Sequence, residues 1–213
     1  SLFKSKQYNI DFINYEELIH SQLIILDQLS ELSRALIQKL EKYIKKGGNL
    51  FIFLNPNANL DSYNSLFQLI NTDFISKWTK NENKLELINY SNDLFKNVFK
   101  RKHNSINLPV VNNYFNIKEN KNAQKREVLK FINNDPFLAE YLYGKGHIFL
   151  LFSDLNREHN NFAEHALFVP CIYNSVIMHL KNRNIYHVIK NETIIEQNNI
   201  VKSDIIHLKK DIS

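Results

Sequence analysis

The stretch from Gln22 to Pro56 constrains the fold of this chain more than any other, and it has three parts. An apolar run, LIIL at 23–26, precedes an amphipathic segment that ends in Gly-Gly, and a second run, NLFIFL at 49–54, follows. A strand that is covered by helices on both faces has a continuous apolar sequence rather than an alternating one. The order of the three parts therefore predicts a strand–helix–strand unit, the building block of parallel α/β sheets.

The middle part of this stretch has the signals of a helix. Its apolar residues recur at helical spacing and form one stripe, which comprises Leu36, Ile37, Leu40 and Ile44. Ser30 and Ser33 are both candidate N-caps, because a hydroxyl can accept a hydrogen bond from a free N–H at the helix start. Gly47 can adopt the left-handed conformation that ends a helix.

This unit resembles a segment of the class I glutamine amidotransferase-like superfamily, on the residues LIILDQLSELSRALIQKLEKYIKKGGNLFIFL. In the catalytic members, the second strand runs into a nucleophile elbow, which exposes a cysteine thiolate at a helix N-terminus and lowers its pKa. The corresponding turn here, Leu54 to Asn57, contains neither cysteine nor serine. The resemblance therefore implies the scaffold without the amidotransferase activity.

The rest of the chain predicts further elements on both sides of a β-rich stretch. We expect strands at 8–13, 85–88, 108–117 and 127–132, a hairpin of 137–143 with 147–152, helices at 61–70 and 162–181, and a helix or tight turn at 74–78. The expected fold class is three-layer α/β, with a mainly parallel sheet of flavodoxin-like or amidotransferase-like type and a β-rich insertion at about 84–152. We expect one domain over 1–182, with 183–213 as a β-rich extension or the start of a following domain.

Composition narrows the function classes. The 213 residues are 44% hydrophobic, and no run approaches the ~20 apolar residues that a membrane span needs. The net charge is +5, but the basic residues are scattered. The densest group, Lys100 to His103, is typical of a solvated loop, so we expect no nucleic-acid partner. The single cysteine, Cys171, leaves no internal disulfide, and on an amphipathic helix it is typical of a small core residue.

Candidate binding residues follow the predicted strands, at the carboxyl edge where open α/β sheets bind ligands. They are Asp27, Asn55, Asp154, Glu158, His159 and His165. The loop 153–165 offers oxygen and nitrogen atoms that suit a divalent metal, but its spacing matches no zinc pattern. We favour a polar loop with a helix N-cap there, and we expect no catalytic residue, no metal and no cofactor.

A second resemblance covers about residues 20–180. The segments LxxYIKKGGNLFIFLNP, YGKGHIFLLFSDLN and NNFAEHALFVPCIYNSV, with the β-rich middle, resemble the C-terminal amidotransferase-like region of bacterial membrane-anchored proteins related to the Bat aerotolerance group. The resemblance implies a non-catalytic domain with a protein partner, in a parent protein that is associated with the membrane on an unspecified side. The alternatives are a sugar-binding or hydrolytic domain akin to the ThuA-like branch, and a metal-dependent hydrolase that uses the 153–165 loop.

Overall fold

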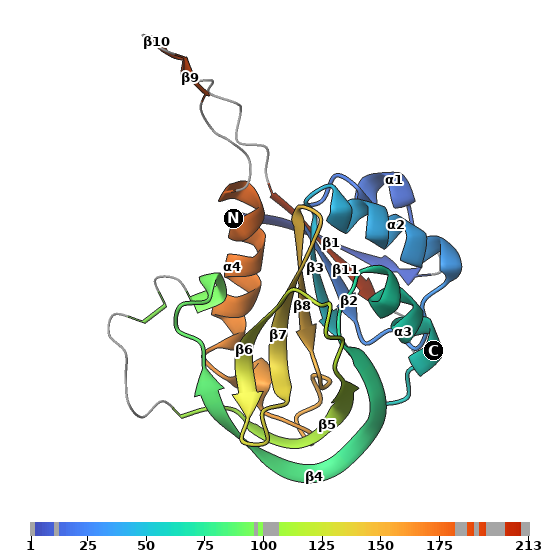
Figure 1. Ribbon diagram of the computed structural model, residues 1–213. Coiled ribbons are helices and arrows are strands. Elements are labelled where there is room, and N and C mark those ends of the chain that lie inside the picture. Colours follow the sequence, from blue (N-terminus) through green and yellow to red (C-terminus); the bar gives the residue numbers. More distant parts are fainter. Residues whose placement is uncertain are drawn as a thin grey trace.

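A nine-stranded mixed sheet, in the order β1-β11-β2-β3-β8-β7-β6-β4-β5, runs through the molecule (Figure 1). The computed structural model describes residues 3–10, 13–95, 98–99, 107–181, 187–189, 192–194 and 203–209. The basic group Lys100 to His103 lies outside them. The helices are α1 (Tyr15–Leu18), α2 (Arg34–Lys45), α3 (Leu60–Leu69) and α4 (Phe168–Lys181), with short 3-10 turns η2 (Asp93–Phe95) and η3 (Phe162–Glu164). No helix in the described ranges is both long and apolar enough to cross a membrane.

Five neighbouring strands form the parallel half of the sheet. They are β1 (Phe3–Asn9), β11 (Ser203–Lys209), β2 (Leu23–Asp27), β3 (Asn49–Phe53) and β8 (Gly146–Leu151). Strand β11 belongs to the segment 183–213, and it lies inside the sheet between β1 and β2. The same segment also contains an antiparallel pair, β9 (His187–Ile189) and β10 (Glu192–Ile194).

The predicted strand–helix–strand unit is confirmed. Helix α2 connects β2 to β3, and these two strands pair in parallel along their full length. Ser33 is the N-cap of α2, and its side chain accepts a hydrogen bond from the backbone N–H of Leu36. Gly47, whose φ is 109°, follows the end of the helix as predicted.

Helices cover both faces of the parallel half, which explains the apolar runs. Helices α2 and α3 lie on one face and α4 on the other (Figure 1). Along β2, Ile24 and Leu26 pack in the core beneath α2 and α3, whereas Leu23 and Ile25 pack in the core beneath α4. All four side chains are at most 1% exposed. Because both faces of the strand are buried, every one of these positions requires an apolar residue.

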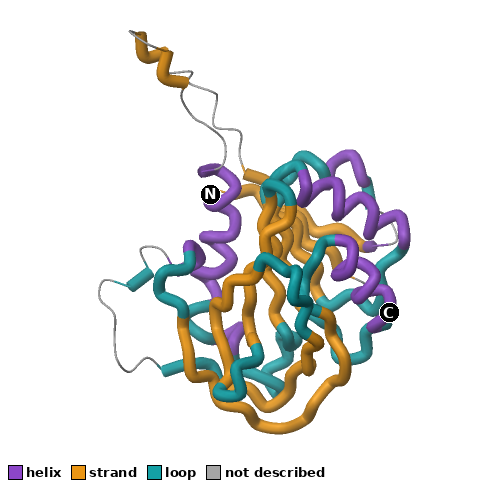
Figure 2. The backbone as a smooth tube through the Cα atoms, in the orientation of Figure 1, coloured by secondary structure: helices purple, strands orange, loops and turns teal. Residues whose placement is uncertain are grey.

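The other half of the sheet is antiparallel and curled (Figure 2). Its strands are β4 (Phe74–Ile88), β5 (Val110–Lys118), β6 (Lys125–Phe131) and β7 (Pro136–Tyr143). The predicted hairpin is confirmed, since β7 pairs with β8 across the Gly-Lys-Gly turn. The curl ends where β5 meets the segment after β8: the Phe115 N–H donates to the Phe152 carbonyl (2.8 Å), and the Asn112 N–H to the His159 carbonyl (2.7 Å).

The expected fold class is therefore wrong: the sheet is mixed and half antiparallel, rather than a mainly parallel flavodoxin-like sheet. The β-rich stretch is no insertion into a parallel sheet, because its strands extend the sheet directly from β8. The prediction of a helix or tight turn at 74–78 is also wrong, since these residues begin β4. A register shift between Ile75 and Trp78 interrupts the alternation by which a strand is recognised.

Helix boundaries differ from the predictions in smaller ways. Asn59, rather than Asp61, caps α3, and Asp61 lies in its first turn. Helix α4 begins at Phe168, and the 3-10 turn η3 occupies the first residues of the predicted helix. Cys171 is fully buried in α4, and burial raises the pKa of its thiol, as is usual for a core cysteine.

Candidate functional site

Several of the predicted site residues share one edge of the sheet. Strands β2, β3 and β8 are parallel neighbours, so their carboxyl ends lie side by side. Asp27 ends β2, Asn55 follows β3, and Asp154 follows β8. The Leu54 N–H donates to the Ser153 carbonyl at 3.3 Å, which continues the pairing of β3 and β8 to the positions next to Asn55 and Asp154. The topology thus places these three polar side chains along one carboxyl edge.

At the ends of β2 and β3, two polar turns brace one another. Gln28 adopts a left-handed backbone conformation, with a φ of 54°. Its N–H donates to the Phe53 carbonyl (3.0 Å), and its own carbonyl accepts from the Asn55 side-chain amide (3.0 Å). Its side-chain amide donates to Asp27 Oδ1 at 3.1 Å. A non-glycine residue in this conformation costs free energy, and it persists because its surroundings fix it.

At the end of β8, a buried carboxylate holds an imidazole. Asp154 Oδ2 lies 2.6 Å from His159 Nδ1, the Asp154 residue is 2% exposed, and the His159 side chain is 21% exposed. Burial raises the pKa of the Asp154 carboxyl group, and the hydrogen bond from His159 opposes this shift. A carboxylate can only accept, so Nδ1 donates and Nε2 is left for another contact. This is the geometry of an imidazole base that a carboxylate orients.

The end of β8 is covered by the curled half of the sheet. Ser153 Oγ donates to the Asn113 carbonyl at 2.8 Å, and the Asn160 side chain donates to Ser153 Oγ at 3.0 Å. Trp78 of β4 meets the His159 ring edge-on, with 5.3 Å between ring centroids. The Asp154–His159 pair thus contacts β4 through Trp78 and β5 through the N–H groups of Asn112 and Asn113, which donate to the His159 carbonyl, and the His159 side chain stays 21% exposed.

Glu158 and His165 do not join this pair. The Glu158 side chain is exposed, and His165 Nε2 bonds the Asn107 carbonyl (2.9 Å) and lines a separate hollow beside Glu164. His159 and His165 thus have different partners. No group of three or more His, Cys, Asp and Glu side chains that could hold a metal ion occurs among the described residues.

A second carboxylate–imidazole pair was missed by the sequence predictions. Glu140 Oε1 lies 2.6 Å from His147 Nδ1, and Glu140 Oε2 accepts from the Asn92 side chain at 2.7 Å. Glu140 is fully buried in β7. The sequence did contain a signal for this pair. Glu140 is the only charged residue of the apolar run PFLAEYLY, and His147 lies on the other strand of the predicted hairpin. Gln28 was also missed, and nothing local in the sequence marks it.

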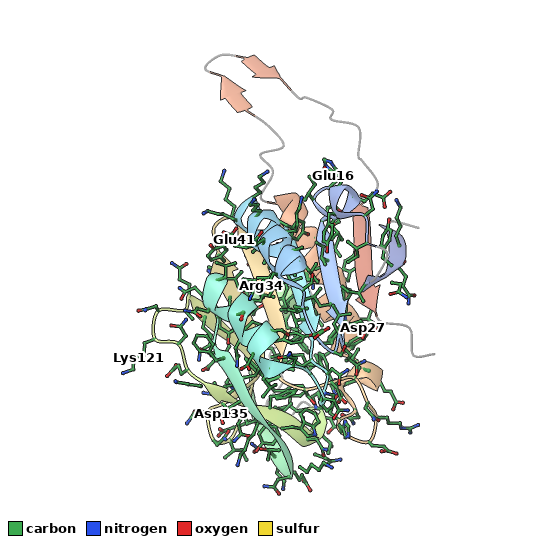
Figure 3. All side chains as sticks on the ribbon, turned by 90° about the vertical axis from the view of Figure 1, so that its right-hand side faces the viewer. Glu16, Asp27, Arg34, Glu41, Lys121 and Asp135 are labelled. Atoms are coloured by element: carbon green, nitrogen blue, oxygen red, sulfur yellow. The ribbon has the colours of Figure 1, made fainter. Side chains whose placement is uncertain are left out.

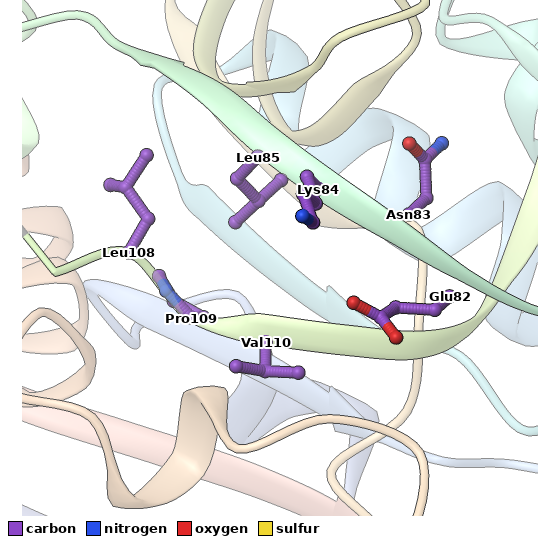
Figure 4. A pocket seen from close by; sticks show the side chains of 7 residues that line it. All are labelled: Glu82, Asn83, Lys84, Leu85, Leu108, Pro109 and Val110. Carbon is purple, nitrogen blue, oxygen red and sulfur yellow. The ribbon is translucent and has the colours of Figure 1, made fainter.

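A hollow of about 280 Å³ lies where β4 and β5 diverge (Figure 4). It is lined by Glu82, Asn83, Lys84, Leu85, Leu108, Pro109 and Val110. None of the predicted site residues lines it, so it is separate from the carboxyl edge.

Comparisons with known proteins show the fold and no family. No family model and no curated protein matches the chain. Similar solved structures include the cytoplasmic proteins STM3548 and STM1381 of Salmonella typhimurium, both with a TM-score of 0.58, at 16% and 12% identity. They cover 79% and 80% of this chain, which covers 76% of each. The mmIFT52 N-terminal domain has a TM-score of 0.53 at 16% identity, over 82% of this chain and 83% of that one.

Proposed function

We propose that the chain is a non-catalytic interaction domain that binds a protein partner at the carboxyl ends of β2 and β3. The observation that carries this proposal is the braced pair of polar turns at that edge, around Gln28 and Asn55. Groups that are already held in place lose little conformational freedom when a partner binds, so a rigid edge favours recognition. The neighbouring end of β8 is covered by the protein's own strands.

The use of Asn55 supports binding rather than catalysis. In catalytic members of the superfamily that the sequence resembles, the corresponding turn carries the nucleophile. Here Leu54 is fully buried, and the Asn55 side chain donates to Gln28 and accepts from the Asn57 N–H at 2.8 Å. This turn therefore serves as a structural brace. The resemblance to Bat-type proteins extends the proposal to a membrane-associated bacterial parent protein.

A sugar-binding or hydrolytic domain, akin to the ThuA-like branch, is the second candidate. The Asp154–His159 pair beside Trp78 favours it, because Asp154 engages Nδ1 of His159 and leaves Nε2 as the nitrogen that could act as a general base. An aromatic wall beside polar groups also suits a sugar ring.

A thermal-shift screen with sugars, nucleotides, glutamine and divalent metals separates the two candidates. A ligand at a hundredfold excess over its Kd stabilises the folded state by roughly 2.7 kcal/mol. If the chain is an interaction domain, we expect none of these ligands to cause a change in Tm that depends on Asp154 or His159. A shift that disappears in Asp154→Ala and His159→Ala, but persists in Asn133→Ala in the exposed β6–β7 turn, would contradict the proposal and favour the second candidate.

A further inference from the structure

A groove of about 480 Å³ lies between α2 and α3. It lies next to the pair of hydrogen-bonded turns around Gln28 and Asn55, which we call the braced edge. Leu32 and Ile37 line it as buried apolar residues, and Leu69 of α3 lines it with a side chain that is 44% exposed. Figure 3 looks onto this face of the molecule, with Arg34 and Asp27 labelled. The groove thus combines three apolar side chains, one of them exposed, with charged and polar side chains, which is the composition of a recognition site.

The polar side chains that line the groove are not used by the fold. The side chains of Glu31, Arg34, Gln38 and Asp61 are exposed, and none forms a hydrogen bond or ion pair with a described residue. Asp27 and Asn55 differ, because the protein itself engages them. Arg34 is also the first residue of α2, where a positive charge opposes the helix dipole and no acidic residue lies in the first turn. An anionic group that contacts Arg34 would relieve this.

Hydrogen bonds between the segments at the starts of α2 and α3 hold the walls of the groove. The Leu32 N–H donates to Ser62 Oγ at 3.1 Å, and the Asn59 N–H donates to the Ser30 carbonyl at 2.7 Å. These bonds fix the N-terminal ends of α2 and α3 relative to one another. The groove is therefore preformed, and a ligand need not open it.

The size of this face favours a short segment over a globular partner. Helices α2 and α3 have 12 and 10 residues, so they are about 18 and 15 Å long, and side by side they present roughly 330 Å². A stable interface between two globular proteins buries about 800 Å² on each side. The groove is thus too small to hold a second copy of the chain by itself, but it matches a peptide of a few residues.

We propose that this groove binds a peptide segment of the partner protein that carries an apolar side chain next to a carboxylate. The apolar side chain packs against Leu32, Ile37 and Leu69, and the carboxylate pairs with Arg34. A basic residue on the other side of the segment pairs with Glu31 or Asp61. The inference rests on the proposed function, and it adds which side chains of the partner are bound and which surface binds them.

The pairing of Arg34 with a carboxylate of the peptide can be tested by selecting a random peptide library on phage, against the wild-type domain and against Arg34→Glu. Wild-type selection is expected to enrich an apolar residue next to Asp or Glu, and Arg34→Glu is expected to enrich Lys or Arg at that place. For a selected peptide, fluorescence anisotropy should show Kd raised at least tenfold by Arg34→Glu and by Leu69→Ser. The matched control is Lys42→Glu, the same charge change on α2 outside the groove.

Two results would overturn the inference. In one, no peptide is enriched with a Kd below 1 mM. In the other, selected peptides bind Arg34→Glu and Leu69→Ser as tightly as they bind the wild type. If those peptides instead lose affinity in Asp27→Lys or Asn57→Arg, the braced edge binds them without the groove, and the proposed function stands. Circular dichroism of each variant shows whether the fold is intact.

Discussion

Removing one hydroxyl group from the core should destabilise this protein measurably. Tyr141 of β7 is fully buried, and its hydroxyl donates to Asp73 Oδ2 at 2.8 Å. Asp73 is also fully buried, and it accepts from Lys125 Nζ (3.0 Å) and from the Asn120 N–H (2.8 Å). Burial and the neighbouring Asp73 hold the pKa of Tyr141 well above its usual value, so the phenol stays a neutral donor. The cluster joins the start of β4 to β6, β7 and the turn before β6.

Tyr141→Phe leaves the ring in place and deprives a buried carboxylate of one donor. A hydrogen bond to a charged group contributes about 1.5–3 kcal/mol, and water cannot easily replace it at a fully buried site. We therefore expect the free energy of unfolding to fall by about 2 kcal/mol, measured by urea denaturation. For a chain of this length, this loss lowers Tm by roughly 4–8 °C.

The matched control is two residues along the same strand. Tyr143 donates to Glu41 Oε1 at the same distance, 2.8 Å, but it is only partly buried. Water can replace this bond, so Tyr143→Phe should cost less than about 0.5 kcal/mol. A double-mutant cycle of Tyr141→Phe with Asp73→Asn should show a coupling of at least about 1 kcal/mol. Equal losses for the two tyrosine variants, with no coupling to Asp73, would refute the reasoning.

Three further outcomes are expected. Gln28→Gly should leave the free energy of unfolding unchanged or raise it, whereas Gln28→Val should lower it by about 1–2 kcal/mol in urea denaturation, because a β-branched residue tolerates a φ of 54° poorly. Equal effects of the two substitutions would contradict the left-handed conformation of Gln28. The folded-state pKa of Asp154 is raised above 3.8, so folding favours the protonated carboxyl group. The free energy of unfolding of the wild type, relative to that of Asp154→Asn, should therefore fall as the pH rises from about 4 through the folded-state pKa. A difference that rises with pH would show that the pKa is shifted in the opposite direction. Cys171 is fully buried with a raised pKa, so a thiol reagent should modify it only at the rate of unfolding, and rapid labelling of the native protein would place the thiol at the surface.

The sequence alone determined the part of the fold whose signals are local. In β2, α2 and β3, two doubly buried strands flank a capped amphipathic helix that ends at Gly47, so each residue type agrees with its neighbours' structure. The hairpin of β7 and β8 was predictable for the same reason, because its turn residues adjoin the strands that they connect. The shared edge of Asp27, Asn55 and Asp154 followed from parallel pairing.

Only the tertiary structure decided the curl of the sheet, the place of β11 and the surroundings of His159. The curl depends on bonds such as that from Phe115 to Phe152, between residues far apart in the chain, and alternation along β5 does not encode its partner. Strand β11 enters between β1 and β2 although their sequences are not adjacent to it. The groove beside Arg34 likewise exists only because two helix starts are joined through Ser62 and Asn59. Local propensity specifies an element, but the hydrogen-bonded edges that meet are chosen by packing of the whole chain.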